Sequence, residues 1–62
     1  MSGGWWVEWT DQNGVHNHTA TFETKDKATD AADRLRKQGL ATDTLLHEAK
    51  AGGLTEAYRV GF

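Results

Sequence analysis

Residues 5–22 have the sequence WWVEWTDQNGVHNHTATF, and this stretch decides the fold. Runs rich in aromatic and β-branched residues flank Asn13-Gly14, the pair most typical of a tight hairpin turn. A type I′ turn needs a positive φ at both central positions, which Asn and Gly adopt at the lowest cost. The stretch therefore predicts a β-hairpin that turns at Asn13 and Gly14.

The turn also predicts which side chains share a face of this hairpin. If Gln12 faces Val15, the pairs on one side are Trp9 with His18, Val7 with Ala20 and Trp5 with Phe22. The pairs on the other side are Thr10 with Asn17, Glu8 with Thr19 and Trp6 with Thr21. The first side is largely apolar and is expected to face the core. The second side is polar except for Trp6, which makes it the candidate for a function.

Residues 25–38 have the features of one amphipathic helix. Thr24 is a favourable N-cap, and Asp26 lies in the first turn, where the helix dipole favours an anion. Gly39 can take the left-handed conformation that ends a helix, which would set Leu40 against Leu35 in a Schellman ending. The apolar residues recur at helical spacing: Ala28, Ala31, Ala32 and Leu35.

Gly52-Gly53 lies between two strand-like runs, so residues 42–62 are predicted to form a second hairpin. With a two-residue turn there, the pairs are Leu45 with Val60, His47 with Tyr58 and Asp43 with Phe62. On the opposite side Leu46 faces Arg59, and Glu48 faces Ala57. A longer turn would change these pairs, and residues 44–50 could instead form a short helix.

Together these segments predict an α+β fold with the order β-β-α-β-β. The fold would be a four-stranded, mostly antiparallel sheet with one helix packed on one face and no cover on the other. Residues 1–4 are interpreted as a flexible leader and residues 5–62 as a single small domain. The large side chains expected in the core are Trp5, Val7, Trp9, Phe22, Leu45, Val60 and Phe62.

The composition excludes several classes of protein. The chain has 62 residues and no cysteine, so disulfides and zinc sites built on thiolates are excluded. A core of this size is barely adequate, so burial or association must stabilise the domain. The formal net charge of −2 argues against nucleic-acid binding through overall charge. No apolar run is long enough for a signal peptide or a membrane span, so we expect a cytoplasmic protein without a membrane partner.

The sequence offers little for catalysis, so we expect no enzyme, no cofactor and no small-molecule substrate. Ser2 lies in the leader, and no pair of carboxylates is placed by its spacing around a pocket. His16, His18 and His47 are enough in number for a metal site. A His-x-His pair on a strand is common, however, so no metal is expected.

The uncovered face of the sheet is the predicted binding surface for a protein partner or a second copy of the chain. Its aromatic, aliphatic and Arg side chains are the types enriched at interface centres. The alternative for Trp6 is that it simply shields the sheet or exchanges faces with its neighbours. The candidate binding residues are Trp6, Glu8, Thr19, Thr21, Leu46 and Arg59.

A second hypothesis is DNA binding through basic residues. The candidates are Arg34, Arg36, Lys37, Lys50 and Arg59. A structural explanation is equally good for the helix, because cations in its last turn complement the dipole. Asp30 and Asp33 are also spaced to pair with Arg34 and Lys37.

Residues 5–38 also resemble the arm-type DNA-binding domain of phage tyrosine integrases. The matching parts are Trp6-Val7-Glu8-Trp9-Thr10, the Asp11-x-x-Gly14 turn, and Phe22-x-Thr24-Lys25-x-x-Ala28 at the start of the helix. The resemblance implies a small sheet backed by a helix, DNA binding by that sheet in the major groove, and an origin in a phage or mobile element. In this sequence the matching sheet face carries no cation, and Glu8 would repel phosphate.

Overall fold

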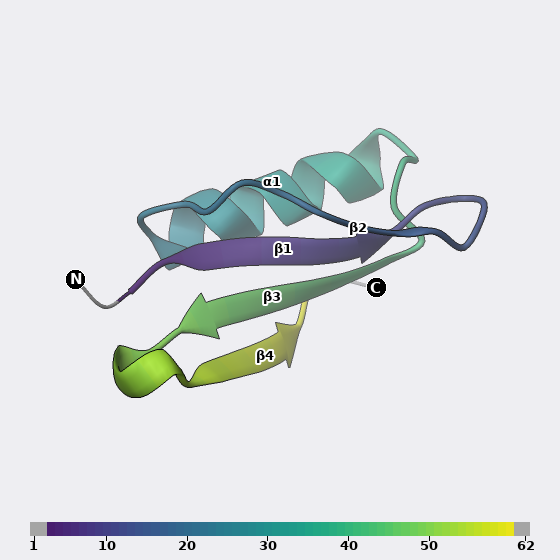
Figure 1. The fold of residues 1–62 in the computed structure, drawn as a ribbon. Helices are drawn as coiled ribbons and strands as arrows, with labels where there is room; N and C mark the ends of the chain where they lie inside the picture. Colours follow the sequence, from purple (N-terminus) through teal and green to yellow (C-terminus); the bar gives the residue numbers. More distant parts are fainter. Residues whose placement is uncertain (1–2, 61–62) are drawn as a thin grey trace.

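The computed structural model describes residues 3–60, and its strands form a single sheet. The elements are β1 (Trp5–Thr10), β2 (His16–His18), α1 (Lys25–Lys37), β3 (Asp43–Ala49), the short 3₁₀ helix η1 (Ala51–Gly53) and β4 (Thr55–Arg59). The strand order is β2-β1-β3-β4, and every pairing is antiparallel (Figure 1). This confirms the predicted α+β fold and its β-β-α-β-β order. No described helix has the length and apolarity needed to cross a membrane.

The ends of α1 match the sequence signals. The Thr24 hydroxyl accepts a hydrogen bond from Lys27 N at 3.2 Å, which makes Thr24 the N-cap. Gly39 has a φ of 72°, and Leu40 N donates to Leu35 O at 3.0 Å, as in a Schellman ending. The helix therefore begins and ends where local chemistry predicts.

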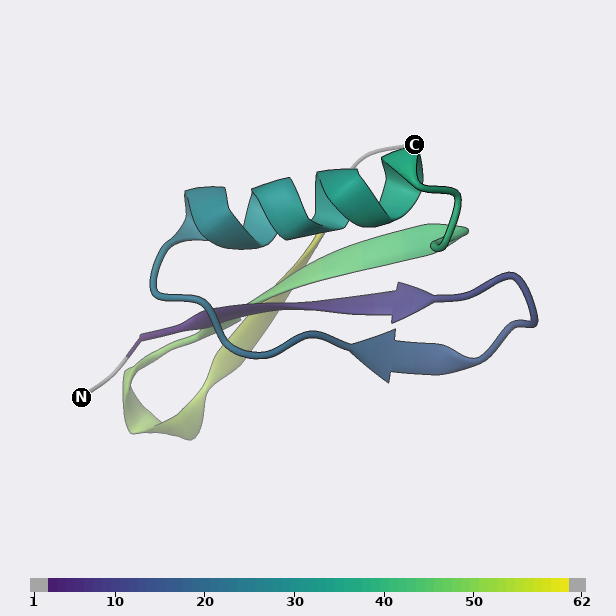
Figure 2. The same ribbon diagram turned by 90° about the horizontal axis from the view of Figure 1, so that it is seen from above.

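α1 lies along one face of the sheet and packs against β1 and β3 (Figure 2). The core is thin: Val7 and Leu46, which are paired across β1 and β3, are fully buried beneath Ala28 and Ala32 of the helix. The partly buried side chains packed against this cluster are Trp5, Trp9, Phe22, Leu35 and Val60. The short residues on the helix let it approach the sheet closely, so the large side chains come mostly from the strands.

The loop of the first hairpin has three residues rather than the predicted two. Asp11 N donates to Val15 O at 2.9 Å, and Gly14 N donates to Asp11 O at 3.1 Å. The Asp11 carboxylate also accepts from the backbone N–H of Val15 (2.9 Å) and of Asn13 (2.8 Å), which lowers the pKa of Asp11. With a φ of 81°, Gly14 takes the left-handed position of a three-residue loop, so the expected type I′ turn is wrong.

The longer loop shifts β2 by one position against β1. The observed pairs are Glu8 with His18, Trp9 with Asn17 and Thr10 with His16. Because successive side chains of a strand point to opposite faces, each β2 side chain changes face relative to the prediction. His16 and His18 therefore lie on the face that carries Trp6.

A β-bulge after β2 restores the predicted pairing further along. Thr19 N donates to Val7 O at 2.9 Å, and the Thr19 hydroxyl accepts from Val7 N at 3.0 Å. The extra residue turns Phe22 back to the helix side, where it packs against the core. The predicted pair of Trp5 with Phe22 is confirmed, and Trp5 N donates to Phe22 O at 2.9 Å.

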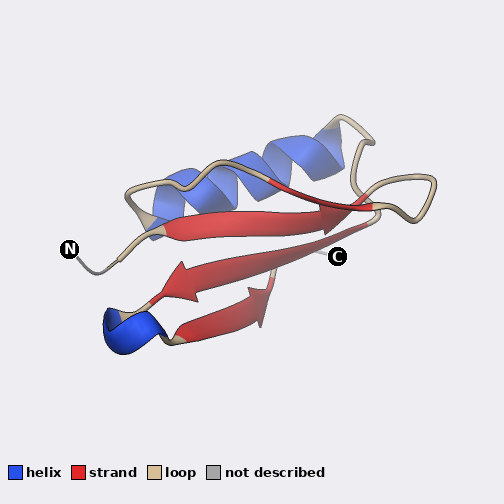
Figure 3. Ribbon diagram, viewed as in Figure 1, coloured by secondary structure: helices blue, strands red, loops and turns tan. Residues whose placement is uncertain are grey.

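The second hairpin also has a longer loop than predicted. Residues 51–53 form η1, which Figure 3 shows at the β3–β4 connection, and Lys50 N donates to Leu54 O at 2.7 Å across it. The observed pairs are therefore Leu45 with Arg59, Leu46 with Tyr58, His47 with Ala57 and Glu48 with Glu56. The strand interpretation of residues 44–50 is confirmed over the helical alternative, whereas the two-residue turn is wrong.

The two leucines of β3 lie on the faces opposite to those predicted, because β3 pairs with β1 so that Leu46 lies beside Val7. Leu46, expected on the uncovered face, is fully buried under the helix. Leu45, expected in the core, lies on the opposite face and pairs with Arg59. Phe62, also expected in the core, lies outside the described residues, as do Met1 and Ser2. Gly4, assigned above to the flexible leader, is buried, and its carbonyl accepts from Ala49 N at 2.9 Å.

Candidate interaction face

The sheet face opposite α1, called the open face below, is the candidate site. In Figure 1 the helix lies behind the sheet, and no element within residues 3–60 covers the side toward the viewer. Its side chains alternate with those under the helix and come from all four strands: Trp6, Glu8, Thr10, His16, His18, Asp43, Leu45, His47, Ala49, Thr55, Ala57 and Arg59.

The centre of the open face is an ordered cluster of Trp6, His47 and Glu8. Trp6 and His47 are direct cross-strand partners, and their rings stack with centroids 5.1 Å apart and planes 5° apart. His47 Nε2 donates to Glu8 Oε1 at 2.9 Å, and the His47 side chain is 19% exposed. Leu45 is the neighbour of Glu8 on β3. These contacts hold a large aromatic surface in one orientation before any partner binds.

One end of the open face is polar. Arg59 donates to the Asp43 carboxylate, and this hydrogen bond lowers the pKa of Asp43. His16 adds a smaller lowering effect, because it lies near the same carboxylate. Thr10 Oγ1 and His16 Nδ1 are 3.3 Å apart, so a hydrogen bond joins β1 and β2 there. The arrangement is an aromatic and aliphatic centre with charged groups beside it, which is the pattern of many protein interfaces.

The structure keeps three of the six predicted binding residues on the open face: Trp6, Glu8 and Arg59. The prediction of Leu46 as a binding residue is wrong, because its side chain is buried in the core. The prediction of Thr19 is also wrong, because Thr19 lies on the helix side, where its hydroxyl accepts a hydrogen bond from Val7 N. Thr21 is exposed and lies outside β2, next to Gly4.

Sequence reasoning missed Leu45, His47, His16 and His18 as members of the open face. His16 and His18 reach this face because the three-residue loop shifts β2 by one residue. Leu45 and His47 reach it because β3 pairs with β1. The signal in the first hairpin was Asp11, whose carboxylate holds the backbone of the longer loop. For the second hairpin, no comparable side-chain signal precedes the diglycine.

The five cations proposed for DNA binding are not brought together. Arg36 points inward and donates to Thr44 Oγ1 at 3.3 Å and to Asp33 Oδ1 at 3.0 Å. Lys37 also pairs with Asp33, at 2.9 Å. Near β4, Lys50 pairs with Glu56 at 3.0 Å and Arg59 pairs with Asp43. Arg34 lines a groove between α1 and the segment that follows β2, which is described below.

The three histidines do not form a metal site. His16 and His18 lie on β2, whereas His47 lies on β3 beyond β1. Within residues 3–60, no three His, Asp or Glu side chains are arranged to hold a metal ion.

No protein family model, curated protein or solved structure matches this chain. The geometry of the open face is therefore the basis for a proposed function.

Proposed function

We propose that this chain is a small, non-enzymatic interaction module that binds protein through the open face, and that a second copy of the chain occupies this face. The observation that carries the proposal is the stacked pair of Trp6 and His47 beside Leu45, on a sheet face without cover among the described residues. Aromatic side chains held in place at low entropy cost are the usual anchors of protein interfaces.

The thin core favours a second copy as the occupant. The only large apolar side chains that are fully buried in residues 3–60 are Val7 and Leu46. A domain this small is often stabilised by association, because one core cannot remove enough apolar surface from water. Face-to-face packing of two sheets would bury Trp6 and Leu45 of both copies and form a second core.

The charges on the open face disfavour DNA, the alternative that the integrase resemblance implies. Glu8 and Asp43 lie on this face, and Arg59, its one Lys or Arg among residues 3–60, already pairs with Asp43. A duplex would therefore meet carboxylates where it needs cations.

Light scattering across a dilution series tests the proposal. We expect twice the chain mass of 6.9 kDa at high concentration and a single chain on dilution. Trp6→Ala is expected to weaken the dimer about tenfold or more. Leu40→Ala is the matched control, because Leu40 is an exposed leucine in the connection after α1, away from the open face.

Far-UV circular dichroism of each variant separates lost association from lost folding. If Trp6→Ala does not fold, Leu45→Ala decides the question by the same measurement. A single chain at every concentration, or a dimer that neither variant weakens, overturns self-association through this face. A salt-sensitive complex with duplex DNA that Trp6→Ala abolishes would favour the alternative.

A further inference from the structure

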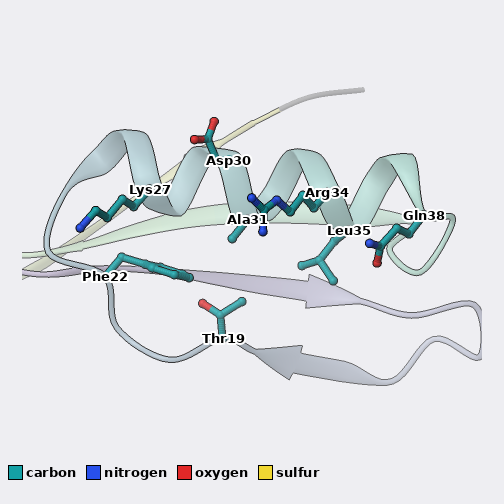
Figure 4. A pocket seen from close by; sticks show the side chains of 8 residues that line it. All are labelled: Thr19, Phe22, Lys27, Asp30, Ala31, Arg34, Leu35 and Gln38. Carbon is teal, nitrogen blue, oxygen red and sulfur yellow. The ribbon is translucent and has the colours of Figure 1, made fainter.

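A groove lies on the opposite side of the sheet from the open face, between α1 and the segment that leads from β2 into it. Its volume is about 420 Å³, which is in the range of ligand-binding sites. Figure 4 shows Phe22 and Thr19 below the helix and the helical side chains above them. The lining residues are Thr19, Phe22, Lys27, Asp30, Ala31, Arg34, Leu35 and Gln38.

The groove combines an apolar floor with two cations. Phe22 and Leu35 are only partly buried by the core, so each presents apolar surface to the groove. Lys27 and Arg34 come from one side of α1, and neither has an ion-pair partner within residues 3–60. Figure 4 shows the Asp30 carboxylate pointing away from the floor.

These two cations differ from most of the other Lys and Arg side chains of the protein. Arg36, Lys37, Lys50 and Arg59 each pair with an acid of the protein itself, whereas Lys25 Nζ lies 6.0 Å from the centroid of the Tyr58 ring. Two of the three Lys and Arg side chains without an ion pair in residues 3–60 therefore line this groove, in a chain whose net charge is −2. The groove therefore matches a ligand that has an apolar body and negative charge at both ends.

We propose that the groove binds an extended acidic peptide segment of another protein, with the pattern Glu-x-Leu-x-Glu. Lys27 and Arg34 are seven residues apart, so their Cα atoms are about 10 Å apart along the helix axis. In an extended peptide, alternate side chains share one face, and four residues span about 13 Å. The flexible Lys and Arg side chains can bridge this difference. The leucine lies over Phe22 and Leu35, and the two carboxylates pair with Lys27 and Arg34.

The test is a titration of the ¹⁵N-labelled full chain with a synthetic capped peptide, Gly-Glu-Ser-Leu-Ser-Glu-Gly, followed by NMR at low salt. We expect saturable shifts confined to the amides around Phe22, Ala31 and Leu35. Each exposed ion pair contributes up to about fivefold in affinity, so Lys27→Gln combined with Arg34→Gln is expected to weaken binding about tenfold. Lys25→Gln combined with Lys50→Gln removes the same charge outside the groove and is expected to change the affinity less than about twofold.

Two further peptides separate the parts of the ligand. Replacing both glutamates by glutamine removes the charges, and replacing the leucine by serine removes the apolar anchor, so each change is expected to weaken binding. No saturable shift at millimolar peptide overturns the proposal. Equal weakening by the two charge variants also overturns it, because it would mean that the peptide responds to net charge alone. Shifts on the open face instead of the groove would assign acidic peptides to the open face and likewise reject the groove.

Discussion

The two faces of the sheet use the same strands in different ways. Val7 and Leu46 are fully buried under α1, whereas their chain neighbours Trp6 and Leu45 lie on the open face. The helix face is stabilised by burial and by the inward Arg36, while the open face is organised by stacking and hydrogen bonds around His47. Adjacent residues with similar hydrophobicity thus have different roles, and the alternation of the strand decides which role each one has.

Truncation of the two β3 leucines tests this difference most strongly. Leu46→Ala is expected to cost roughly 2–5 kcal/mol, because it leaves a cavity beneath the helix. Leu45→Ala is expected to cost less than about 1 kcal/mol at dilutions where the chain is monomeric. Urea unfolding followed by tryptophan fluorescence measures both values. A larger loss of stability for Leu45→Ala than for Leu46→Ala would instead support the predicted arrangement, in which Leu45 faces the core.

Removal of an arginine from each face gives the second comparison. Arg36 is 17% exposed and joins α1 to Thr44 and to the Val60 carbonyl, so Arg36→Gln is expected to cost roughly 1–3 kcal/mol. Arg59 is 63% exposed, and its pairing with Asp43 is screened by water, so Arg59→Gln is expected to leave the unfolding free energy nearly unchanged. Thermal unfolding of the two variants measures the difference. Similar melting temperatures would contradict the inward role of Arg36.

Acid is expected to destabilise both faces. Hydrogen bonding to Lys37 lowers the pKa of Asp33 on the helix, and hydrogen bonding to Arg59 lowers that of Asp43 on the open face. A carboxyl whose pKa is lower in the folded chain adds stability above its ordinary value of 3.8, and this stability is lost as the pH falls further. Melting temperature against pH for Asp33→Asn and Asp43→Asn checks this: each variant is expected to lose part of the acid dependence. A variant that keeps the full wild-type dependence contradicts the pairing.

The smallest effect concerns the outer edge of the helix face, where the Lys25 side chain of α1 lies over the Tyr58 ring. Tyr58, the one tyrosine of the chain, lies on that side of β4 and is 39% exposed. Its hydroxyl donates to the Glu56 carboxylate, which raises the pKa of Tyr58 from 10.0 to about 12. The added stability is present below pH 10.0 and is lost as the pH rises through about 12.

Ultraviolet titration of the tyrosine is expected to give a midpoint near 12 for the wild type and a lower midpoint for Glu56→Gln. A wild-type midpoint at the ordinary value of 10.0 would show that this contact does not form in solution.

Most of the fold could be predicted because its signals are local. Thr24 and Gly39 mark the helix ends through hydrogen bonds within a few residues. The spacing of Trp5, Val7 and Trp9 around Glu8 and Thr10 favours one face of β1 for the core, although Trp6 on the other face is also aromatic. The candidate site was only half predictable, because Leu45 and His47 reach the open face through the long-range pairing of β1 with β3, which neighbouring residues do not specify.

The sequence by itself determined the kinds of element, their order and the core-facing side of α1, since periodicity and capping act over short distances. Only the tertiary structure decided the loop lengths, which place the β2 side chains, and the pairing of β1 with β3, which places the β3 side chains on the open face. Hairpin loops of two and three residues are both common, so the choice depends on what each register buries. In this chain the observed registers place Phe22 and Leu46 against the alanines of α1, and that burial leaves Leu45 and His47 beside Trp6 on the open face.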